Sequence, residues 1–207
     1  MTIATDKSTY SFAEYLELEE TATYKHEYQD GEIVPMTGGT TDHNKIAGNF
    51  YFYLRLKLPQ SHYKIFIGDV KVWIAQYRQA TYPDVMLIEG EPIYYETGKT
   101  TITNPRLIVE VLSKSTQNYD QGDKFLYYRS LPELQEYILI SQSRPYIMQY
   151  NKTEENKWLL TEYEGENASL SLTSVNFDLS FQEIYEGVIF NDLPWIFVFL
   201  PVFSPSR

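Results

Sequence analysis

The sequence contains no cysteine, which excludes disulfide bonds and metal sites built from thiolates. A chain of 207 residues without cysteine fits the reducing cytoplasm, and we expect a cytoplasmic protein. The opening segment, MTIATDKSTYSF, has neither a basic start nor an apolar stretch, so no secretion signal is predicted.

Long hydrophobic runs are also missing. The strongest apolar segment, WIFVFLPVF at residues 195–203, is far too short to cross a bilayer and contains Pro201. We interpret residues 1–190 as a single domain and residues 191–207 as an apolar C-terminal tail of unassigned role. The tail and the 19 tyrosines favour a homo-oligomer, with a homodimer as the expected form.

Basic residues are few. The formal net charge of −11 argues at first against a nucleic-acid partner, because phosphate contacts require lysine and arginine. The acidic excess, however, lies at the two ends of the chain, and residues 33–130 carry eleven basic and nine acidic side chains. The middle of the chain therefore permits a polyanionic partner such as DNA.

The remaining composition, 43% hydrophobic and 22% charged, is typical of a globular protein. Ser11 and Ser180 are predicted helix N-caps, and Asp42 is predicted to cap a helix that presents Ile46, Phe50 and Leu54 on one face. The other patterns predict a hairpin over 24–36 and a helix that begins at Thr116 or Asn118 and runs to Arg129. They also predict strands over 64–74, 81–88, 106–112, 136–140, 146–151 and 157–163. This order of elements indicates an α+β domain.

One charge interrupts an apolar strand. The segment RLIVEVLSKST, residues 106–116, is typical of a buried strand and has Glu110 in its middle. A buried carboxylate is costly unless it is protonated, paired or bound to a metal. The alternative is an edge strand whose solvent face carries Glu110.

A second carboxylate begins the preceding strand. In TYPDVMLIE, residues 81–89, Asp84 follows Pro83 at the point where the apolar strand starts. Two carboxylates on adjacent antiparallel strands can hold a hard divalent cation, which neutralises both charges. Proline and aspartate are also ordinary turn residues, so a plain strand-opening turn is the competing interpretation.

The order of these features is similar to the PD-(D/E)XK nuclease core. In that core the two acids bind magnesium, and a lysine two residues after the second acid helps to activate or position the attacking water. Leu112 occupies the lysine position in this sequence. Lys124 follows Asp120 by four residues on the next predicted helix, and we interpret it as the replacement that reaches back to the acids. A plain surface ion pair between Asp120 and Lys124 is the alternative.

The chain as a whole resembles the bacterial Uma-two family, a domain of unknown function described as restriction-type endonucleases. The resemblance covers about Phe12 to Phe190 and rests on an ordered series of segments: HEYQDGEIVPM, Asp42-His43, YPDVMLI, PRLIVEVLSKST, YDQGDKFLYYRS and ELQEYILIS. It implies a restriction-endonuclease-like α/β fold with a mixed central sheet flanked by helices. It also implies hydrolysis of DNA phosphodiester bonds with Mg²⁺, or with Mn²⁺ in its place.

The resemblance further implies roles for individual residues. Asp84 and Glu110 would be catalytic metal ligands, with the carbonyl of Val111 as a third ligand. Lys124 stands where the family has its helix lysine. His43 matches a family histidine and would contact the substrate or a metal-bound water, with a helix-capping or surface histidine as the alternative.

Two other functions stay open at this point. The displaced lysine and the acidic flanks fit a non-catalytic descendant that serves as a binding or assembly module. Asp84 and Glu110 also fit the acid–base pair of a metal-free hydrolase. Glu27, in the predicted hairpin, and Lys71, in the predicted strand at 64–74, are expected to face solvent. Approach to the acidic centre is the alternative for Glu27, and contact with phosphate is the alternative for Lys71.

Overall fold

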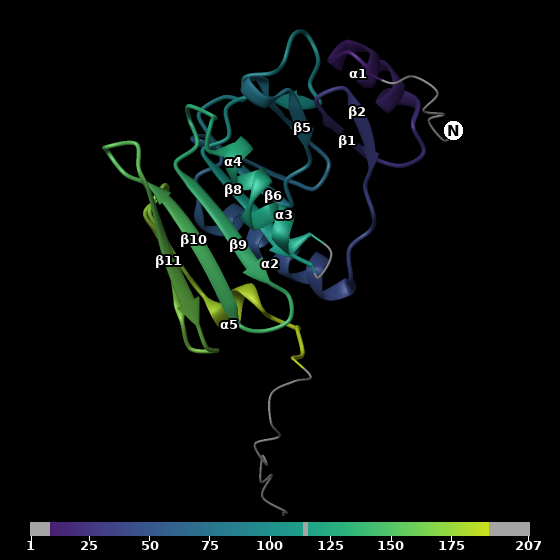
Figure 1. The fold of residues 1–207 in the computed structure, drawn as a ribbon. Helices are drawn as coiled ribbons and strands as arrows, with labels where there is room; N and C mark the ends of the chain where they lie inside the picture. The colour runs from purple at the N-terminus through teal and green to yellow at the C-terminus, as the bar shows by residue number, and fades with distance from the viewer. Residues whose placement is uncertain (1–8, 114–115, 191–207) are drawn as a thin grey trace, which may run out of the picture.

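Two β-sheets and a hairpin form the body of the protein in the computed structural model, which describes residues 9–113 and 116–190. The larger sheet has the strand order β11-β10-β9-β8-β6-β3 (Figure 1). Its strands are β3 (Tyr63–Ile67), β6 (Val85–Glu89), β8 (Leu107–Leu112), β9 (Glu136–Ser141), β10 (Tyr146–Lys152) and β11 (Trp158–Glu164). Strands β8 and β9 are parallel and the other described pairs are antiparallel, so this sheet is mixed, as predicted.

The smaller sheet has the strand order β2-β1-β5-β4-β7. Its strands are β1 (His26–Gln29), β2 (Glu32–Pro35), β4 (Lys71–Ile74), β5 (Gln79–Thr81) and β7 (Thr101–Ile102). A separate antiparallel hairpin consists of β12 (Ser169–Leu172) and β13 (Phe177–Ser180). The chain passes directly from the smaller to the larger sheet between β5 and β6, so that short connection lies at the boundary of the two sheets.

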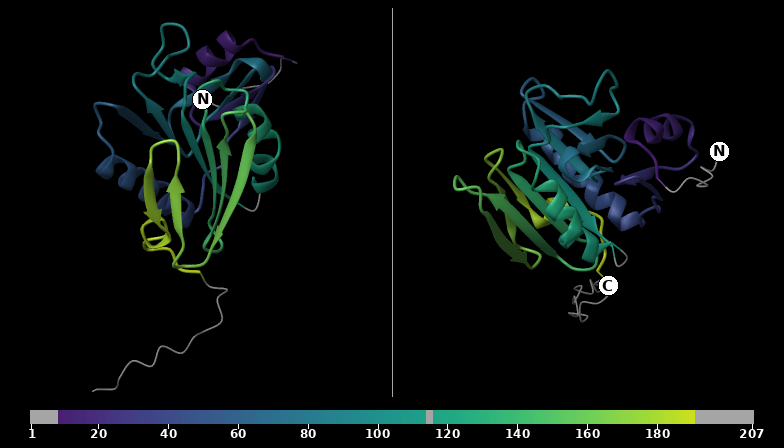
Figure 2. Two further views of the ribbon diagram at one scale, coloured as in Figure 1. Left: turned by 90° about the vertical axis from the view of Figure 1, so that its left-hand side faces the viewer. Right: turned by 45° about the horizontal axis from the view of Figure 1, so that its top comes forward.

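Helices cover both faces of the six-stranded sheet. They are α1 (Phe12–Thr21), α2 (Thr41–Lys57), α3 (Gln117–Gln121), α4 (Asp123–Tyr128) and α5 (Phe181–Ile184), with a short 3-10 turn at Ala75–Tyr77. Helices α3 and α4 lie on one face of the sheet together with part of the smaller sheet, and α2 lies on the other face with α5 and the hairpin (Figures 1 and 2). Helix α1 packs against the smaller sheet.

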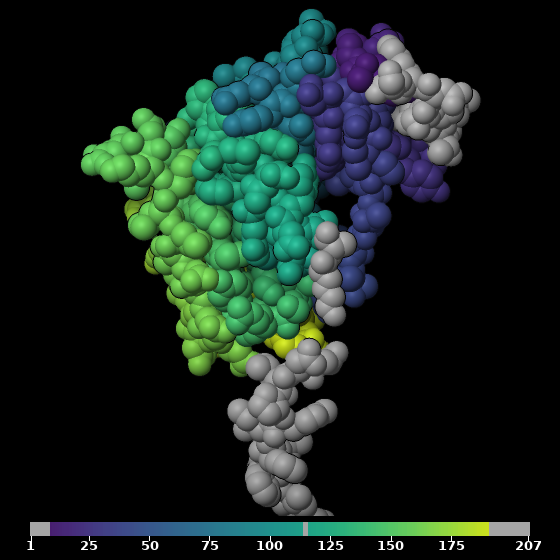
Figure 3. All heavy atoms as spheres, viewed as in Figure 1, coloured from purple at the N-terminus to yellow at the C-terminus, as the bar shows by residue number. Residues whose placement is uncertain are grey.

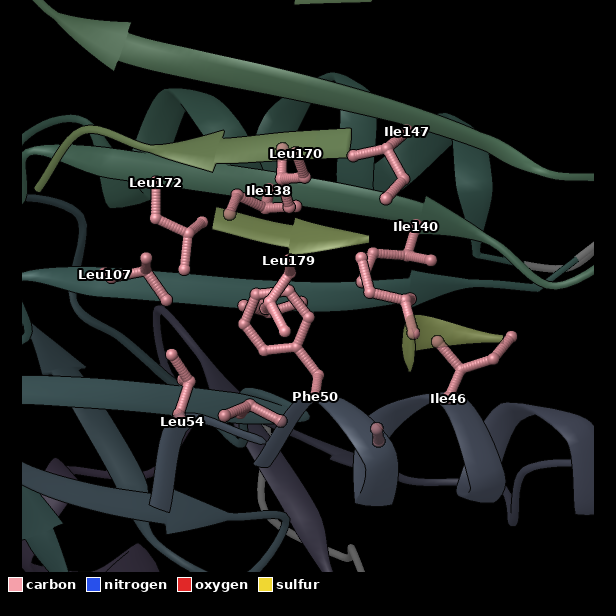
Figure 4. Close-up of a cluster of buried hydrophobic side chains, with 14 of the residues drawn as sticks. Ile46, Phe50, Leu54, Leu107, Ile138, Ile140, Ile147, Leu170, Leu172 and Leu179 are labelled. Carbon is pink, nitrogen blue, oxygen red and sulfur yellow. The ribbon is translucent and has the colours of Figure 1, made fainter. Parts of the chain in front are cut away.

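The main hydrophobic core lies between α2 and the six-stranded sheet. Ile46, Phe50 and Leu54 are fully buried and point from one face of α2 to the strands, which confirms the predicted helical face (Figure 4). Each such side chain contributes roughly 1.5–3 kcal/mol through its removal from water. Alternate residues of β8 face the other core, so Val109 packs towards α2 and Ile108 towards α4.

Two of the three predicted helix caps are confirmed. Ser11 and Ser180 each form a capping box with the glutamate three residues later. Asp42 is not a cap, because α2 begins at Thr41 and the hydroxyl of Thr40 accepts the hydrogen bond from the backbone N–H of His43 at 3.1 Å. Asp42 instead lies in the first turn, where its charge favours the helix N-terminus.

The predicted strands at 64–74 and 81–88 are each divided between the two sheets. Gly68 interrupts the first with φ of +66°, a conformation that residues with a side chain rarely adopt. Pro83 interrupts the second, since it has no N–H to donate to a neighbouring strand. Each was predicted as one extended segment because apolar residues stand on both sides of the break.

The predicted helix over 116–129 is two short helices, because Gly122 has φ of −104° and ψ of −98°, outside the helical region. The β12–β13 hairpin was not predicted, since its short strands carry serines that give a weak hydrophobic pattern. Residues 191–207 lie outside the described part of the chain, so the C-terminal tail and the domain boundary remain predictions. Of the helices in residues 9–113 and 116–190, none is long and apolar enough to cross a membrane.

Candidate active site

Asp84 lies one residue before β6, where the chain enters the six-stranded sheet. Strands β6 and β8 are antiparallel with Val85 opposite Val109, and the same register places Asp84 opposite Glu110. Oδ2 of Asp84 accepts a hydrogen bond from the backbone N–H of Val111 at 2.7 Å. The two predicted acids therefore lie on neighbouring strands at the same end of the sheet.

The same hydrogen bond defines the direction of the Val111 carbonyl. In a β-strand the N–H and C=O of one residue point to the same side. Because the N–H of Val111 points to Asp84, the carbonyl of Val111 also points to the side of β8 on which β6 lies. It lies near the start of β6. The carbonyl of Val111 and the carboxylates of Asp84 and Glu110 thus lie near one another, at the end of the sheet where β6 begins.

Glu110 is 4% exposed, so the outward-facing alternative is wrong. It shares with Leu112 the face of β8 that α4 covers. Oε1 of Glu110 accepts hydrogen bonds from Nζ of Lys124 at 2.9 Å and from the hydroxyl of Tyr128 at 2.8 Å. Burial raises the pKa of Glu110 to about 8; the Lys124 ammonium opposes this shift and the charge of Asp84 adds to it.

Lys124 is 6% exposed and lies among three carboxylates. Its Nζ is 2.9 Å from Oε1 of Glu110 and 3.6 Å from the nearest oxygens of Glu27 and Asp120. Burial alone would lower the pKa of the ammonium, but the surrounding acids outweigh it and hold this pKa well above its ordinary value. Asp120 is buried as well, so the surface ion-pair alternative for Asp120 and Lys124 is wrong.

The prediction of solvent exposure is also wrong for Glu27 and Lys71, which are 8% and 6% exposed. Glu27 lies on β1 of the smaller sheet, and the ammonium of Lys124 reaches it from α4. Lys71 lies on β4 and donates a hydrogen bond to the hydroxyl of Tyr82 at 3.3 Å. Alternation along a short strand shows which residues share a face, but not that helices cover both faces of the sheet.

Tyr128 was not among the predicted site residues. Its hydroxyl donates to Glu110 and also lies 2.7 Å from the hydroxyl of Thr81 on β5, so it connects the two sheets beneath the lysine. Burial raises the pKa of Tyr128 well above its ordinary value, so the phenol is a hydrogen-bond donor at neutral pH. A tyrosine four residues after Lys124 shares its helix face, and this spacing was the available signal.

His43 lies in the first turn of α2, and its Nε2 is 3.1 Å from Oδ2 of Asp84. Burial lowers the pKa of the imidazole, but the hydrogen bond and charge of Asp84 outweigh burial and raise it. The side chains of His43 and Asp84 are 19% and 21% exposed, so solvent reaches both groups. The capping alternative for His43 is wrong, since Thr40 provides the cap with its side chain.

One cavity of about 1080 Å³ connects these groups. Its walls include His43, Asp84, Glu110, Asp120 and Lys124. The segment that leads into α2 lies on one side of it and α3 and α4 on the other, as the blue and teal regions of the space-filling view show (Figure 3). The structure therefore brings all the sequence-predicted site residues into one cavity wall.

The charge of the cluster favours a cation. Glu27, Glu110 and Asp120 surround a single ammonium, which leaves more negative than positive charge in a buried region. Within the part of the chain that the structure describes, no group of three or more histidine, aspartate or glutamate side chains is arranged as a metal site. The oxygen atoms that could hold a cation here are those of two carboxylates, Asp84 and Glu110, and the carbonyl of Val111. Mg²⁺ usually keeps several waters and binds one or two protein carboxylates.

Comparison with known structures defines the class of fold. The chain is similar to a crystal structure described as "a putative nuclease belonging to DUF820 from Anabaena variabilis ATCC 29413", with a TM-score of 0.71 and 16% sequence identity. The match covers 87% of this chain and 99% of that one. This likeness confirms the predicted fold, in which helices flank a mixed sheet.

A comparison with protein families then gives the particular family. The model of the Uma2 family, described as "Putative restriction endonuclease", matches residues 12–182, and the chain belongs to this family. Two relatives from Synechocystis sp. (strain ATCC 27184 / PCC 6803 / Kazusa) are both described as uncharacterized proteins. Protein sll1609 is 42% identical over 84% of this chain and 97% of its own length, and slr1290 is 36% identical over 86% and 92%.

Proposed function

We propose that this protein is an endonuclease that hydrolyses DNA phosphodiester bonds with a divalent cation, Mg²⁺ or Mn²⁺. The observation that supports it best is the arrangement of Asp84 and Glu110 on neighbouring strands, with Nζ of Lys124 2.9 Å from the second acid. The description of the family and the nuclease-type fold agree with this reaction.

In this proposal Asp84, Glu110 and the carbonyl of Val111 hold the cation. When bound, a divalent cation lowers the pKa of a coordinated water and neutralises charge on the phosphate oxygens. Glu110 is kept in place by its two hydrogen-bond donors, Lys124 and Tyr128, and Asp84 by the backbone N–H of Val111. The acids are therefore preorganised before the substrate arrives.

Lys124 supplies positive charge next to the reacting phosphate. Its pKa is held above the ordinary value, so the ammonium keeps its proton at neutral pH. It orients the attacking water and offsets the negative charge that develops as the water attacks phosphorus. His43, at the solvent-accessible wall beside Asp84, donates a hydrogen bond to a non-bridging phosphate oxygen when it is protonated.

Cleavage of supercoiled plasmid by the full chain tests the proposal. The wild type is expected to nick the plasmid with Mg²⁺ or Mn²⁺ and to lose this activity in EDTA. Asp84→Asn and Glu110→Gln are expected to be inactive, whereas Glu154→Gln, which alters an exposed loop carboxylate, is expected to match the wild type. Equal activity of Asp84→Asn and wild type would remove Asp84 from the mechanism.

The same assay separates the two other functions. Cleavage that survives EDTA would favour the metal-free acid–base hydrolase. The displaced lysine position, which Leu112 fills with a core side chain, is the observation that favours a non-catalytic binding module. DNA binding by the wild type without cleavage, and without Mg²⁺ or Mn²⁺ binding by calorimetry, would support that module.

A further inference from the structure

The break between α3 and α4 lies next to the candidate catalytic lysine. Gly122 separates the two helices and has φ of −104° and ψ of −98°. Lys124 lies on one side of the break, and Asp120, one of the three acids around its ammonium, lies on the other. The direction that the chain takes at Gly122 therefore sets how these two buried groups face each other.

Position 122 has no room for a side chain. A Cβ atom on Gly122 would lie 2.9 Å from the carbonyl oxygen of Asn118, closer than Cβ atoms approach other atoms in proteins. That oxygen accepts a hydrogen bond from the backbone N–H of Gly122, with the nitrogen 3.0 Å away. The contact is with the backbone rather than with a flexible side chain, so a larger residue at 122 would change the direction of the chain there.

Tyr137 on β9 holds the break from the side of the sheet. Its hydroxyl donates a hydrogen bond to the backbone carbonyl of Asp120 at 3.0 Å, and the tyrosine is fully buried. In an unbroken helix the carbonyl of residue 120 would accept the N–H of residue 124. The tyrosine supplies a donor to this carbonyl where α3 ends, which satisfies a backbone group of a buried residue.

The ring of Tyr137 also packs on the other side of the break. It stacks on the ring of Phe125 with the centroids 5.6 Å apart and lies 5.4 Å from the ring of Tyr128. Both partners belong to α4, so one side chain contacts α3 through its hydroxyl and α4 through its ring. Burial and the nearby charge of Glu110 raise the pKa of Tyr137 well above its ordinary value, so the phenol keeps the proton that it donates.

The ammonium of Lys124 depends on this arrangement because acids from three different elements enclose it. Its Nζ lies 2.9 Å from Glu110 on β8 and 3.6 Å from both Glu27 on β1 and Asp120 on α3. A shift of about 1 Å at the start of α4 would take the closest of these contacts beyond hydrogen-bonding range. The position of α4 relative to α3 thus has to be held closely.

We propose that Gly122 and Tyr137 are positioning residues, which hold the break between α3 and α4 and thereby aim Lys124 at the acids. Leu112 fills the lysine position on β8, so the ammonium beside Glu110 comes from α4. The break decides where that ammonium lies. The effect of the break on cleavage rests on the proposed function, whereas its effect on the position of the ammonium does not.

Nitrogen NMR of the lysine ammonium groups tests this placement without DNA or metal. A buried ammonium exchanges its protons with water slowly enough to give a signal, whereas exposed lysines exchange too fast. The full chain with ¹⁵N-labelled lysine is expected to show protected signals from Lys71 and Lys124, which are the buried lysines among the residues that the structure describes. Lys124→Met identifies the second signal by removing it.

Gly122→Ala and Tyr137→Phe are the informative variants. Each is expected to speed the exchange of the Lys124 protons at least about tenfold and to leave the Lys71 signal unchanged, because only the region around the break opens more often. The Lys71 signal also shows that a variant is folded. If Gly122→Ala does not fold, Tyr137→Phe decides, since it keeps the ring and removes one hydroxyl. A folded variant with the wild-type Lys124 signal would contradict the role of the residue that it replaces.

Two matched controls separate the break from general effects of the same substitutions. Gly48→Ala adds a methyl group to a glycine of α2 that has open space around it. Tyr150→Phe removes a hydroxyl from a ring on β10 that also packs on Phe125, with the centroids 4.2 Å apart. Both controls are expected to keep the wild-type Lys124 signal.

A double variant tests whether Gly122 acts through the lysine. Gly122→Ala is expected to lower the maximal single-turnover cleavage rate about tenfold or more, with the DNA concentration at half-maximal rate unchanged. Gly122→Ala combined with Lys124→Met is expected to cleave no more slowly than Lys124→Met alone, because the glycine has no lysine left to position. Additive losses in the double variant would contradict the proposal.

Failure of the positioning role and failure of the nuclease give different results. Faster exchange of the Lys124 protons in Gly122→Ala and Tyr137→Phe, in a protein that never cleaves DNA, would support the positioning role and refute the proposed function. Metal-dependent cleavage by the wild type, with the wild-type Lys124 signal in both variants, would support the nuclease and refute the positioning role.

Discussion

Nζ of Lys124 on α4 lies 2.9 Å from Oε1 of Glu110 on β8, and both side chains are buried. Leu112, two residues beyond Glu110 on the same strand, packs in the hydrophobic core with α4 and β4. Helix α4, which lies across the face of the sheet, thus brings to Glu110 an ammonium group that β8 itself does not provide. The burial of the pair is costly, and the cluster of acids around it is what makes the charged lysine stable.

Replacement of Lys124 by methionine is expected to reduce Mg²⁺-dependent cleavage by about 100-fold or more, because a positioned charge at the reacting phosphate is lost. Single-turnover plasmid cleavage measures the effect. Mn²⁺ binding by calorimetry should persist in this variant, since Asp84 and Glu110 are unchanged. Unaltered cleavage by Lys124→Met would assign the lysine to the fold alone.

Tyr128→Phe tests the hydrogen bond that holds Glu110 from the other side. The variant keeps the ring but removes the hydroxyl that donates to Glu110 and contacts Thr81. We expect a loss of about 1–3 kcal/mol in the free energy of unfolding, measured by urea denaturation, because two buried polar groups lose a partner. Tyr127→Phe, at the neighbouring half-buried ring, is the matched control and should unfold like the wild type.

Cation affinity is expected to depend on pH through Glu110. Its pKa of about 8 means that the metal-free protein holds this proton at neutral pH, and a metal ligand must give it up. The Mn²⁺ association constant should therefore rise about tenfold for each pH unit between roughly 6 and 8 and level off above that. Calorimetry in buffers of different ionisation enthalpy would detect the released proton, and a constant affinity over this range would contradict the assignment.

The stability of the metal-free protein should respond to the same group. Because the folded-state pKa of Glu110 is raised from 4.5 to about 8, its contribution is fully present below about pH 4.5 and is lost as the pH rises through about 8. Glu110→Gln cannot ionise, so its unfolding free energy should fall less over this range than that of the wild type. Parallel pH profiles of the two proteins, from urea denaturation, would show that Glu110 does not titrate in this way.

The predicted homodimer has a candidate contact at β11. This strand is one of the two edge strands of the six-stranded sheet in the described structure, and its Leu159 and Leu160 side chains are 58% and 43% exposed. Light scattering of the full chain is expected to give the mass of a dimer, and Leu159→Lys is expected to shift it to a monomer. A monomeric wild type would refute the dimer.

The sequence allowed the pairing of Asp84 with Glu110 to be predicted, because Pro83 marks a strand start and apolar residues continue from both acids into adjacent strands. It also allowed the buried face of α2 to be predicted from the spacing of Ile46 and Phe50. These features depend on local patterns of burial, which repeat along one element.

The rest of the site depends on contacts between distant elements. Glu27 became part of the acidic cluster only because α4 packs between the two sheets, and no local pattern on β1 contains that information. The assignment of the segments before and after Gly68 and Pro83 to different sheets likewise follows from the presence of a second sheet, which no local pattern contains. Sequence periodicity did not show that both faces of the smaller sheet are buried, so Lys71 was wrongly predicted to be exposed.

In the proposed site, Asp84 and Glu110 hold one divalent cation together with the carbonyl of Val111. Anomalous diffraction from a crystal soaked in Mn²⁺ would locate this ion. One strong peak is expected within coordination distance of both carboxylates and of the carbonyl, and no such peak is expected in a crystal of Asp84→Asn. A peak elsewhere in the wild type, or a pair of carboxylates without an ion between them at saturating Mn²⁺, would contradict it.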